Sequence, residues 1–390
     1  MRVTRLSLRN FRSYEAEEVR LGRGLTVLTG PNGAGKTNLL EALYFACTGR
    51  SCRTGNEREV VRFGAGVVRL ELDAERDGDS HRITVGFEPG EAKRLAVDGA
   101  PVDRLTDSAA RPLVSVFLPD RLDLVLGAPA LRRAHLDQVI AALWPTRVGT
   151  RRAYSAALAQ RNALLGAIRA GRAGRGSLPA WDQELARHGV ALAADRAAAV
   201  AALDGPFAAH ADALGLEGGA ELAYRPRSKA ERAEELAEEL AERVDSDLER
   251  GFTGHGPHRD ELVLRRAGRE LRTYGSRGQQ RLGLLALLLA ERGVLAAERG
   301  AAPLMLLDDV TSELDTLRRE RLVDLLRETG GQSVIATTDL AHVPGGDGPD
   351  VARLVVADGS VRDEARGGAG GEPPGETVRA SPLGRDRIPA

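Results

Sequence analysis

An octapeptide with the sequence Gly-Pro-Asn-Gly-Ala-Gly-Lys-Thr occupies residues 30–37. The apolar run 25–28 precedes it and the helix-forming run 38–44 follows, which predicts a strand, a glycine-rich turn and a helix. Glycines let backbone amides approach an anion closely, and the free amides of a helix N-terminus add a positive field. In this context the octapeptide is a phosphate-binding loop, in which Lys36 would bridge the β- and γ-phosphates and the Thr37 hydroxyl would bind Mg²⁺.

Lysine is rare in this chain, and one of its few lysines lies in this loop. The 55 basic residues are all arginine except Lys36, Lys93 and Lys229. Lysine carries a compact ammonium group on a flexible stem, whereas the arginine guanidinium is a broad planar fork. A lysine in the loop of a chain that otherwise uses arginine indicates a site shaped around an ammonium group.

The composition is that of a globular protein, and 390 residues are enough for two or three domains. No apolar run approaches the ~20 residues of a membrane span, and residues 1–6 lack the apolar centre of a signal peptide. Cys47 and Cys52 could be a metal or redox pair, but nothing else supplies ligands and we expect reduced thiols. These patterns predict a cytoplasmic protein with no membrane partner. The net charge of −1 gives no overall basic excess, so nucleic-acid binding would require local patches.

The chain divides into four predicted segments. Residues 1–124 mix strand and helix patterns and contain the phosphate loop; within them 67–72 and 81–85 are predicted to be paired strands, and 92–99 carry a hairpin turn signal at Asp98-Gly99. Residues 125–250 are rich in alanine, arginine and leucine at helical spacing, which predicts a helical arm inserted in the middle. Residues 251–362 return to an α/β pattern, with buried-strand runs such as 304–307. Residues 363–390 are rich in glycine, proline and charge, and are predicted to be a disordered tail.

Within the arm, residues 154–162 and 181–187 have helical spacing, and a glycine-rich break at 171–177 separates the two stretches. Apolar side chains at four-residue intervals predict a single charged helix over 230–250. We expect that helix to be a packed part of the arm with a solvated outer face; the alternative is a partner site.

Two further motifs add to the nucleotide site. Asp308 and Asp309 end an apolar strand, where one carboxylate can hold Mg²⁺ and the second can polarise an attacking water. Ser-Arg-Gly-Gln at 276–279 precedes an apolar helix and is a second anion-binding helix start, unless it is an ordinary glycine-containing cap. One nucleotide does not need two cradles in one subunit. A homodimer that sandwiches ATP explains both, with each Ser276 capping the γ-phosphate held by the other subunit.

Together with Ser-Glu-Leu-Asp at 312–315, these motifs resemble those of an ABC-type ATPase head, an α/β P-loop NTPase fold with mixed sheets. The chain is also similar to the RecF family of bacterial recombination proteins, which are related to the SMC and Rad50 heads. The motifs that carry this second similarity lie at residues 8–14, 49–54, 127–137 and 256–261.

The resemblance implies an ATP-dependent DNA-binding protein of DNA repair, DNA replication and the SOS response. Such a protein would form an ATP-dependent homodimer, bind double-stranded and gapped DNA, and hydrolyse ATP slowly as a weak, DNA-dependent ATPase. With RecO and RecR it would help to load RecA at gapped DNA.

The resemblance also assigns roles to individual residues. Catalysis falls to Lys36, Asp308 and Asp309, and Mg²⁺ binding to Thr37 and Asp308. The nucleotide-binding residues are Gly30, Pro31, Asn32, Gly33, Ala34, Gly35, Lys36, Thr37, Asn38, Ser276, Gly278 and Gln279.

The sequence departs from the ABC pattern at three positions. Thr338 stands where a histidine commonly follows the last core strand, and Asp309 is one methylene shorter than the glutamate of transporters. Asp120 lies near the expected place of a glutamine that binds nucleotide. A water-activation site of this kind predicts slow hydrolysis, with ATP timing a clamp on DNA.

Two other functions compete with this interpretation. The ATPase subunit of a membrane transporter is disfavoured by the long separation between Lys36 and Ser276 and by the helical insertion. A chromosome-structural SMC or Rad50 protein would need hundreds of heptad residues, which residues 125–250 cannot supply.

Arginines are the candidate DNA contacts, because phosphates require positive charge without base specificity. Arg5, Arg9 and Arg12 are one group, although Arg12 could instead reach nucleotide. A second group could equally be a solvated helix face, and consists of Arg147, Arg151, Arg152, Arg161, Arg169, Arg172 and Arg175. His255 and His258 lie in a glycine- and proline-containing stretch, which favours a loop over a metal site.

Overall fold

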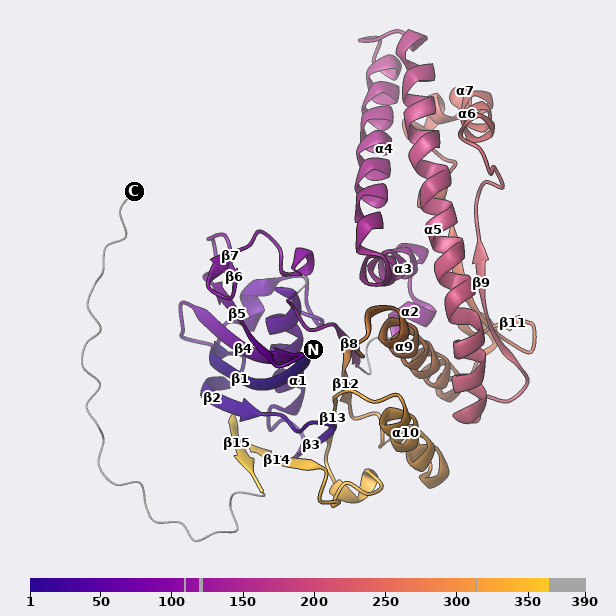
Figure 1. Cartoon of the computed structure of the whole chain (residues 1–390). Coiled ribbons are helices and arrows are strands. Elements are labelled where there is room, and N and C mark those ends of the chain that lie inside the picture. Colours follow the sequence, from indigo (N-terminus) through magenta and orange to yellow (C-terminus); the bar gives the residue numbers. More distant parts are fainter. Residues whose placement is uncertain (109, 119–121, 313, 365–390) are drawn as a thin grey trace, which may run out of the picture.

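The computed structural model describes residues 1–108, 110–118, 122–312 and 314–364. Asp120 and residues 365–390 of the predicted tail 363–390 lie outside the described residues, while Asp363 belongs to a strand. Two large sheets pack on either side of helix α1 (Lys36–Thr48), and a group of long helices projects from this body (Figure 1).

The first sheet is antiparallel, and its strands alternate buried and exposed side chains as half-buried strands do. Its order is β2 (Tyr14–Arg20), β1 (Arg2–Phe11), β4 (Val68–Arg76), β5 (Asp79–Phe87), β6 (Arg94–Val97) and β7 (Ala100–Pro101). Asp98-Gly99 joins the last two strands with φ of 52° and 80°, the two left-handed residues of a type I′ hairpin. The sequence predicted both this turn and the pairing of β4 with β5, and both are confirmed.

The second sheet is mainly parallel and carries the phosphate loop. Its order is β15 (Ser360–Asp363), β14 (Ala352–Ala357), β3 (Leu25–Thr29), β13 (Ser333–Thr337), β12 (Leu304–Asp308) and β8 (Val114–Phe117), with only β15 antiparallel to its neighbour. A third, three-stranded sheet has the order β11 (Arg269–Glu270), β10 (Glu261–Arg266) and β9 (Ala220–Arg225).

The parallel sheet separates two hydrophobic cores because its strands are buried on both faces. On β12, Leu304 and Leu306 point into the core shared with α1 and the antiparallel sheet. Met305 and Leu307 point into the other core, which α9 (Arg277–Arg299) and α10 (Thr316–Glu328) help to form. Because both faces of β12 are apolar, this strand packs against α1 on one side and against α9 and α10 on the other.

Helix α5 (Leu178–Ala213) connects the projection to the body (Figure 1). Its C-terminal part carries Leu203 and Phe207 into the core under α9, and it also packs on β9 and α3 (Pro129–Leu143). Its N-terminal part packs on α4 (Val148–Arg169), with Leu185 in a separate small core. The break between α4 and α5 covers residues 170–177 and includes the predicted stretch 171–177.

The shorter helices are α2 (Asp123–Leu126), α6 (Ala233–Glu242), α7 (Val244–Arg250) and α8 (Leu271–Tyr274). The prediction of one helix over 230–250 was wrong, because the chain starts α6 at residue 233 and breaks at Arg243. The break lets α7 present Asp247 to the fully buried guanidinium of Arg161, 2.7 Å away, so an ion pair overrides the helical periodicity. No helix among the described residues is long and apolar enough to cross a membrane.

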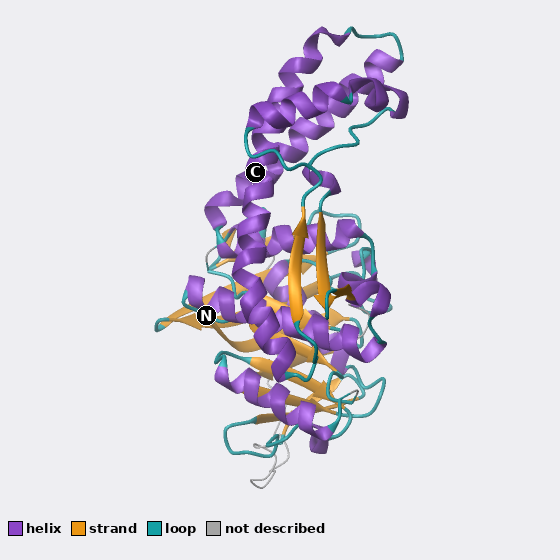
Figure 2. Cartoon of the chain, turned by 90° about the vertical axis from the view of Figure 1, so that its right-hand side faces the viewer, coloured by secondary structure: helices purple, strands orange, loops and turns teal. Residues whose placement is uncertain are grey.

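Figure 2 shows the helical projection standing on the body. Buried ion pairs hold the joint between them. Arg196 on α5 donates to Asp137 at 2.8 Å and to the carbonyl of Pro257 at 2.7 Å. Asp260 accepts from the backbone amide of Arg227 at 2.7 Å, and Tyr224 donates to the same carboxylate. Buried charges of this kind require partners, so the pattern ties α3, α5 and the start of β10 to one arrangement.

Candidate nucleotide site

The predicted phosphate loop joins the end of β3 to the start of α1, as the sequence pattern requires. Gly30, Gly33 and Gly35 have φ of 154°, 81° and 112°, angles that side chains disfavour. A Cβ on Gly30 would lie 2.2 Å from the carbonyl oxygen of Val356, because β14 passes close to the loop. Strand β14 therefore excludes a side chain at Gly30, and the backbone angles favour glycine at all three positions.

Lys36 is buried at the first turn of α1 and is 7% exposed. Its ammonium donates to the carbonyl oxygens of Gly30 at 2.7 Å and Pro31 at 2.9 Å, so the side chain folds back over the loop. Burial lowers the pKa of Lys36, while the nearby carboxylates of Asp308 and Asp309 act in the opposite direction. The positive charge is thus held within the loop.

Thr37 links the loop to the carboxylates predicted at the end of β12. Its hydroxyl donates to Asp308 Oδ2 at 2.7 Å, across 271 positions of sequence. The contact forms because β3, β13 and β12 are parallel and end at the same edge of the sheet. Burial and the charge of Asp309 raise the pKa of Asp308, and the Thr37 hydrogen bond and Lys36 oppose that rise.

Asp309 follows β12 with a φ of 46°, a left-handed conformation that is uncommon outside glycine. Its amide donates to the carbonyl of Ala336 at 3.0 Å, which keeps the residue against β13. Its Oδ1 is buried and has no hydrogen-bond partner among the described residues. A strained backbone and an unpaired carboxylate oxygen are features that cluster at functional sites.

Residues that the sequence analysis did not assign to the site support the loop from behind. The Tyr14 hydroxyl donates to the carbonyl of Gly35 at 2.9 Å, and burial raises the pKa of Tyr14. Asn38 donates to the Ser13 hydroxyl at 3.0 Å and accepts from Arg53 at 2.9 Å. The loop therefore rests on side chains from two of the family motifs, at 8–14 and 49–54.

Glu41 on α1 is the point where those motifs meet. Its carboxylate is fully buried and accepts from Arg12 at 2.8 and 2.9 Å, from Arg53 at 3.2 Å and from Ser51 at 2.5 Å. The Arg12 guanidinium is thus hydrogen-bonded to Glu41 on α1 of the same chain. A lone glutamate between Leu40 and Ala42 in an otherwise apolar stretch was the available signal.

The second predicted cradle is the N-terminus of α9. Ser276 accepts from the amide of Gln279 at 3.3 Å, and the Gln279 side chain accepts from the amide of Ser276 at 2.9 Å, which forms a capping box. Ser276 and Gly278 are exposed. In the described part of the chain, no hydrogen bond joins Ser276, Gly278 or Gln279 to residues 30–38.

The remaining candidates lie elsewhere. Thr338 is exposed directly after β13. Arg161 is fully buried with Asp182 and Asp247, which excludes it as a DNA contact. Ion pairs to acidic residues from other segments also engage Arg5, Arg147, Arg151 and Arg175.

The two histidines of the loop before β10 have structural partners. His255 bonds Glu239 at 2.5 Å, and His258 bonds the Tyr154 hydroxyl at 2.7 Å and the carbonyl of Thr253 at 2.8 Å. Among the described residues, no group of three or more histidine, cysteine or acidic side chains could hold a metal ion.

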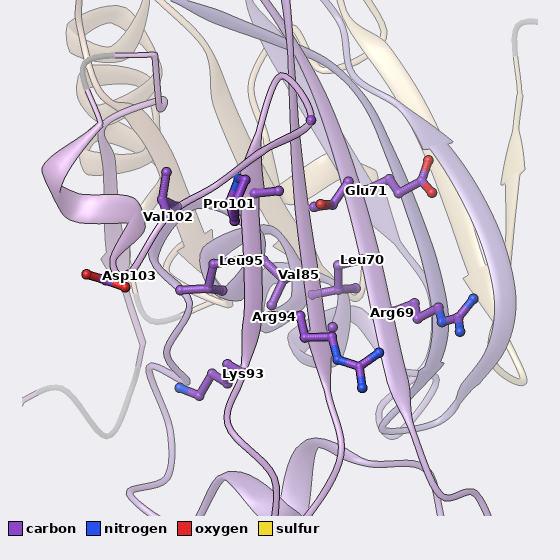
Figure 3. Close-up of a pocket in the computed structure, with 14 residues that line it drawn as sticks. Arg69, Leu70, Glu71, Val85, Lys93, Arg94, Leu95, Pro101, Val102 and Asp103 are labelled. Carbon is purple, nitrogen blue, oxygen red and sulfur yellow. The ribbon is translucent and has the colours of Figure 1, made fainter. Parts of the chain in front are cut away.

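A cavity of about 740 Å³ lies on the antiparallel sheet, away from the phosphate loop (Figure 3). Its lining includes Arg69, Glu71, Arg94 and Asp103 and none of the predicted nucleotide residues. The phosphate loop, and not this cavity, carries the chemistry that the sequence predicts.

Comparisons with known proteins show which family the chain belongs to. The AAA domain family matches residues 5–111. The chain is 39% identical over 375 residues to the DNA replication and repair protein RecF of Anaeromyxobacter sp. (strain Fw109-5), covering 93% of this chain and 99% of that protein. It is 37% identical to RecF of Streptomyces avermitilis, with the same coverage. The chain belongs to the RecF family.

Solved RecF structures share the fold over the same range. The recombination mediator protein RecF solved as RecF-ATPrS in the RecFOR pathway has a TM-score of 0.81 at 27% identity, covering 93% of this chain and 98% of that one. The SMC head bound to a ScpA domain has a TM-score of 0.56 at 17% identity, covers 93% of this chain and 97% of that one, and shares the fold alone. The predicted α/β P-loop ATPase head with mixed sheets and helical segments is confirmed.

Proposed function

We propose that this RecF-family protein is an ATP-dependent DNA-binding protein of recombinational repair and replication restart, in which ATP acts as a switch. The hydrogen bond between Thr37 and Asp308 carries this proposal, because it unites the phosphate loop with the strand-end carboxylates. The similarity to solved structures of RecF-ATP and RecF-ATPrS supports ATP as the nucleotide.

The donor atoms at the edge of the parallel sheet fit Mg²⁺. They are oxygens, the ligands that this hard cation prefers, and Asp309 adds a buried oxygen without a partner. Thr37 and Asp308 would hold the ion, which would supply charge neutralisation to the phosphates. Lys36 would exchange its carbonyl acceptors for phosphate oxygens, and Asp309 would orient the attacking water.

The exposed start of α9 supports a homodimer as the ATP-bound state. Ser276 offers an exposed hydroxyl and Gly278 an exposed amide, and neither is bonded to residues 30–38 of the same subunit, while the amides of Ser276 and Gln279 serve the capping box. These groups would cap the γ-phosphate held by the other subunit. Hydrolysis at a site with Asp309 and Thr338 would be slow, so the dimer would persist on DNA.

The partners follow from the family. We propose that the protein acts in the cytoplasm on double-stranded and gapped DNA, and with RecO and RecR helps to load RecA. Residues 125–250 would form the arm, and the segments 1–124 and 251–362 the ATPase head.

Two substitutions test the switch. Lys36→Ala removes the ammonium that binds phosphate, so the variant should lose ATP binding, ATP-dependent dimers and ATP-dependent binding to gapped DNA. Ser276→Arg fills the second cradle with a bulky cation, so ATP binding should remain while the dimer is lost. Labelled-ATP binding, sedimentation and DNA affinity at stated salt measure these effects. ATP-dependent dimers of Lys36→Ala would contradict the role of the loop.

A further inference from the structure

A second cavity, of about 440 Å³, lies between the C-terminal end of α7 and the segments that flank the β9–β10 pair. Its lining consists of Arg227, Arg250, Phe252, Gly254 and Arg259, which we call the arginine pocket. Three of the five lining residues are arginines and none is acidic. Arg259 belongs to the family motif at 256–261. In the same motif, Pro257 and Asp260 accept hydrogen bonds from Arg196 at the joint.

The fold places two of these arginines opposite each other. In the antiparallel β9–β10 register, Arg225 pairs with Glu261. Arg227 lies two residues after Arg225, and Arg259 lies two residues before Glu261. Both arginines therefore lie beyond the same end of the strand pair, the end nearest the arm. The Arg227 amide donates to Asp260 at 2.7 Å, and Asp260 is buried and also bonded by Arg196 and Tyr224. The buried network therefore holds the Arg227 backbone and includes Asp260, the chain neighbour of Arg259, while the side chains of both arginines are exposed.

The third arginine comes from the arm. Arg250 ends α7, where Gly251 caps the helix with a φ of 80°. The amide of Gly254 donates to Asp247 at 2.9 Å, which holds the chain beside Arg250. A Cβ on Gly254 would lie 3.0 Å from Arg250 Nη1, so glycine leaves the guanidinium room.

These three charges have no ion-pair partner in the part of the chain that the structure describes. Among the described residues, ion pairs engage the neighbouring buried Arg161 and Arg196 but none engages Arg227, Arg250 or Arg259. Arg259 instead lies over the Phe252 ring at 5.3 Å, and that ring is 41% exposed. Burial and the charges of Arg196 and Arg259 lower the pKa of Arg133 nearby, although Glu261 and Asp260 oppose the effect.

We infer that the arginine pocket binds the phosphodiester backbone of a nucleic-acid strand. Guanidinium forks match phosphate oxygens in pairs, and a concave site with three of them suits successive phosphates better than a single ion. The exposed Phe252 ring offers a surface to a base or sugar beside that backbone. This inference rests on the proposed function and adds a contact site at the base of the arm, separate from the phosphate loop.

The test compares the intact protein with a variant that carries Arg227→Gln, Arg250→Gln and Arg259→Gln. All three side chains are exposed, so the fold should hold, and thermal unfolding checks this. With ATP, affinity for gapped DNA should fall by about tenfold or more, and the slope of log affinity against log salt by about 1 per lost phosphate contact. ATP binding and dimerisation should not change. Arg259→Gln alone should give a partial loss.

Arg187→Gln is the matched control, since Arg187 is exposed on the arm but already paired with Glu184 at 2.8 Å. It should leave DNA affinity and the salt slope unchanged. Equal DNA affinity and slope for the triple variant and the intact protein would overturn the inference and leave the proposed function standing. That result together with lost binding to polyglutamate would assign the pocket to an acidic protein partner. No DNA binding by the intact protein in ATP would overturn both proposals.

Discussion

At the scale of single residues, the candidate site concentrates charges that destabilise the folded chain without a ligand. Lys36 is buried with a lowered pKa, Asp308 is buried with a raised pKa, and Asp309 has strained backbone and an unpaired oxygen. Buried charges and strained backbone lower the stability of the chain without ligand. They are expected where side chains are positioned to bind a charged ligand. The site is therefore poised to gain stability when phosphate and a cation arrive.

Asp309→Asn tests the residue proposed to orient water. Asparagine has the same size and also tolerates a φ of 46°, so the fold and ATP binding should remain. Loss of the carboxylate should slow hydrolysis by about 100-fold and prolong the ATP-bound dimer. Phosphate release and dimer lifetime measure both effects. Asp77→Asn is the control, because Asp77 has a φ of 54° in the exposed β4–β5 turn.

At the scale of elements, the loop before β10 is the joint of the molecule. It brings His258 against Tyr154 of α4 and Asp260 against Arg196 of α5. Burial lowers the pKa of His258 to about 4, so the imidazole is neutral in the folded chain. The contacts of the joint therefore include a neutral histidine, whose protonation would place a charge in a buried position.

This histidine predicts acid sensitivity with a definite sign. The folded pKa of about 4 lies below the ordinary value of 6.5, so the contribution to stability is complete above pH 6.5 and is lost as the pH falls toward 4. By about pH 5 the loss should reach about 2 kcal/mol of unfolding free energy. Urea unfolding of the intact protein and of His258→Gln at both ends of this range measures it. An equal pH dependence in the two proteins would contradict the assignment to His258.

At the scale of the whole molecule, α5 joins two cores that are otherwise separate. Leu185 is 1% exposed in the arm core, and Leu203 is 2% exposed in the core under α9. One continuous helix therefore couples the projection to the layer that supports β12 and its carboxylates.

Paired substitutions on α5 test this coupling. Leu185→Ala and Leu203→Ala should each cost about 2–5 kcal/mol, since each opens a cavity in a buried cluster. Hydrogen exchange should show that Leu185→Ala loosens α4 and α6, whereas Leu203→Ala also loosens α9 and weakens ATP binding. If both variants loosen the same amides, the arm and the body unfold as one unit.

The chain predicted those parts of the molecule that depend on local chemistry. The glycine loop, the strands around it, the Asp98-Gly99 turn and the break before α5 follow from backbone angles and periodicity within a few residues. The family was predicted from motifs of the same short range and is confirmed. The helix over 230–250 was wrong because its periodicity says nothing about the distant Arg161 that Asp247 must reach.

Only the tertiary structure decided which charges meet. The contact between Thr37 and Asp308, the convergence of Arg12 and Arg53 on Glu41, and the burial of Arg161 all join segments far apart in sequence. An arginine in a stretch without acids can be neutralised by an acid from another segment, as Arg151 is by Asp137. Local pattern defines what each group can do, but packing determines its partners, because the electrostatic cost of burial depends on neighbours that only the fold supplies.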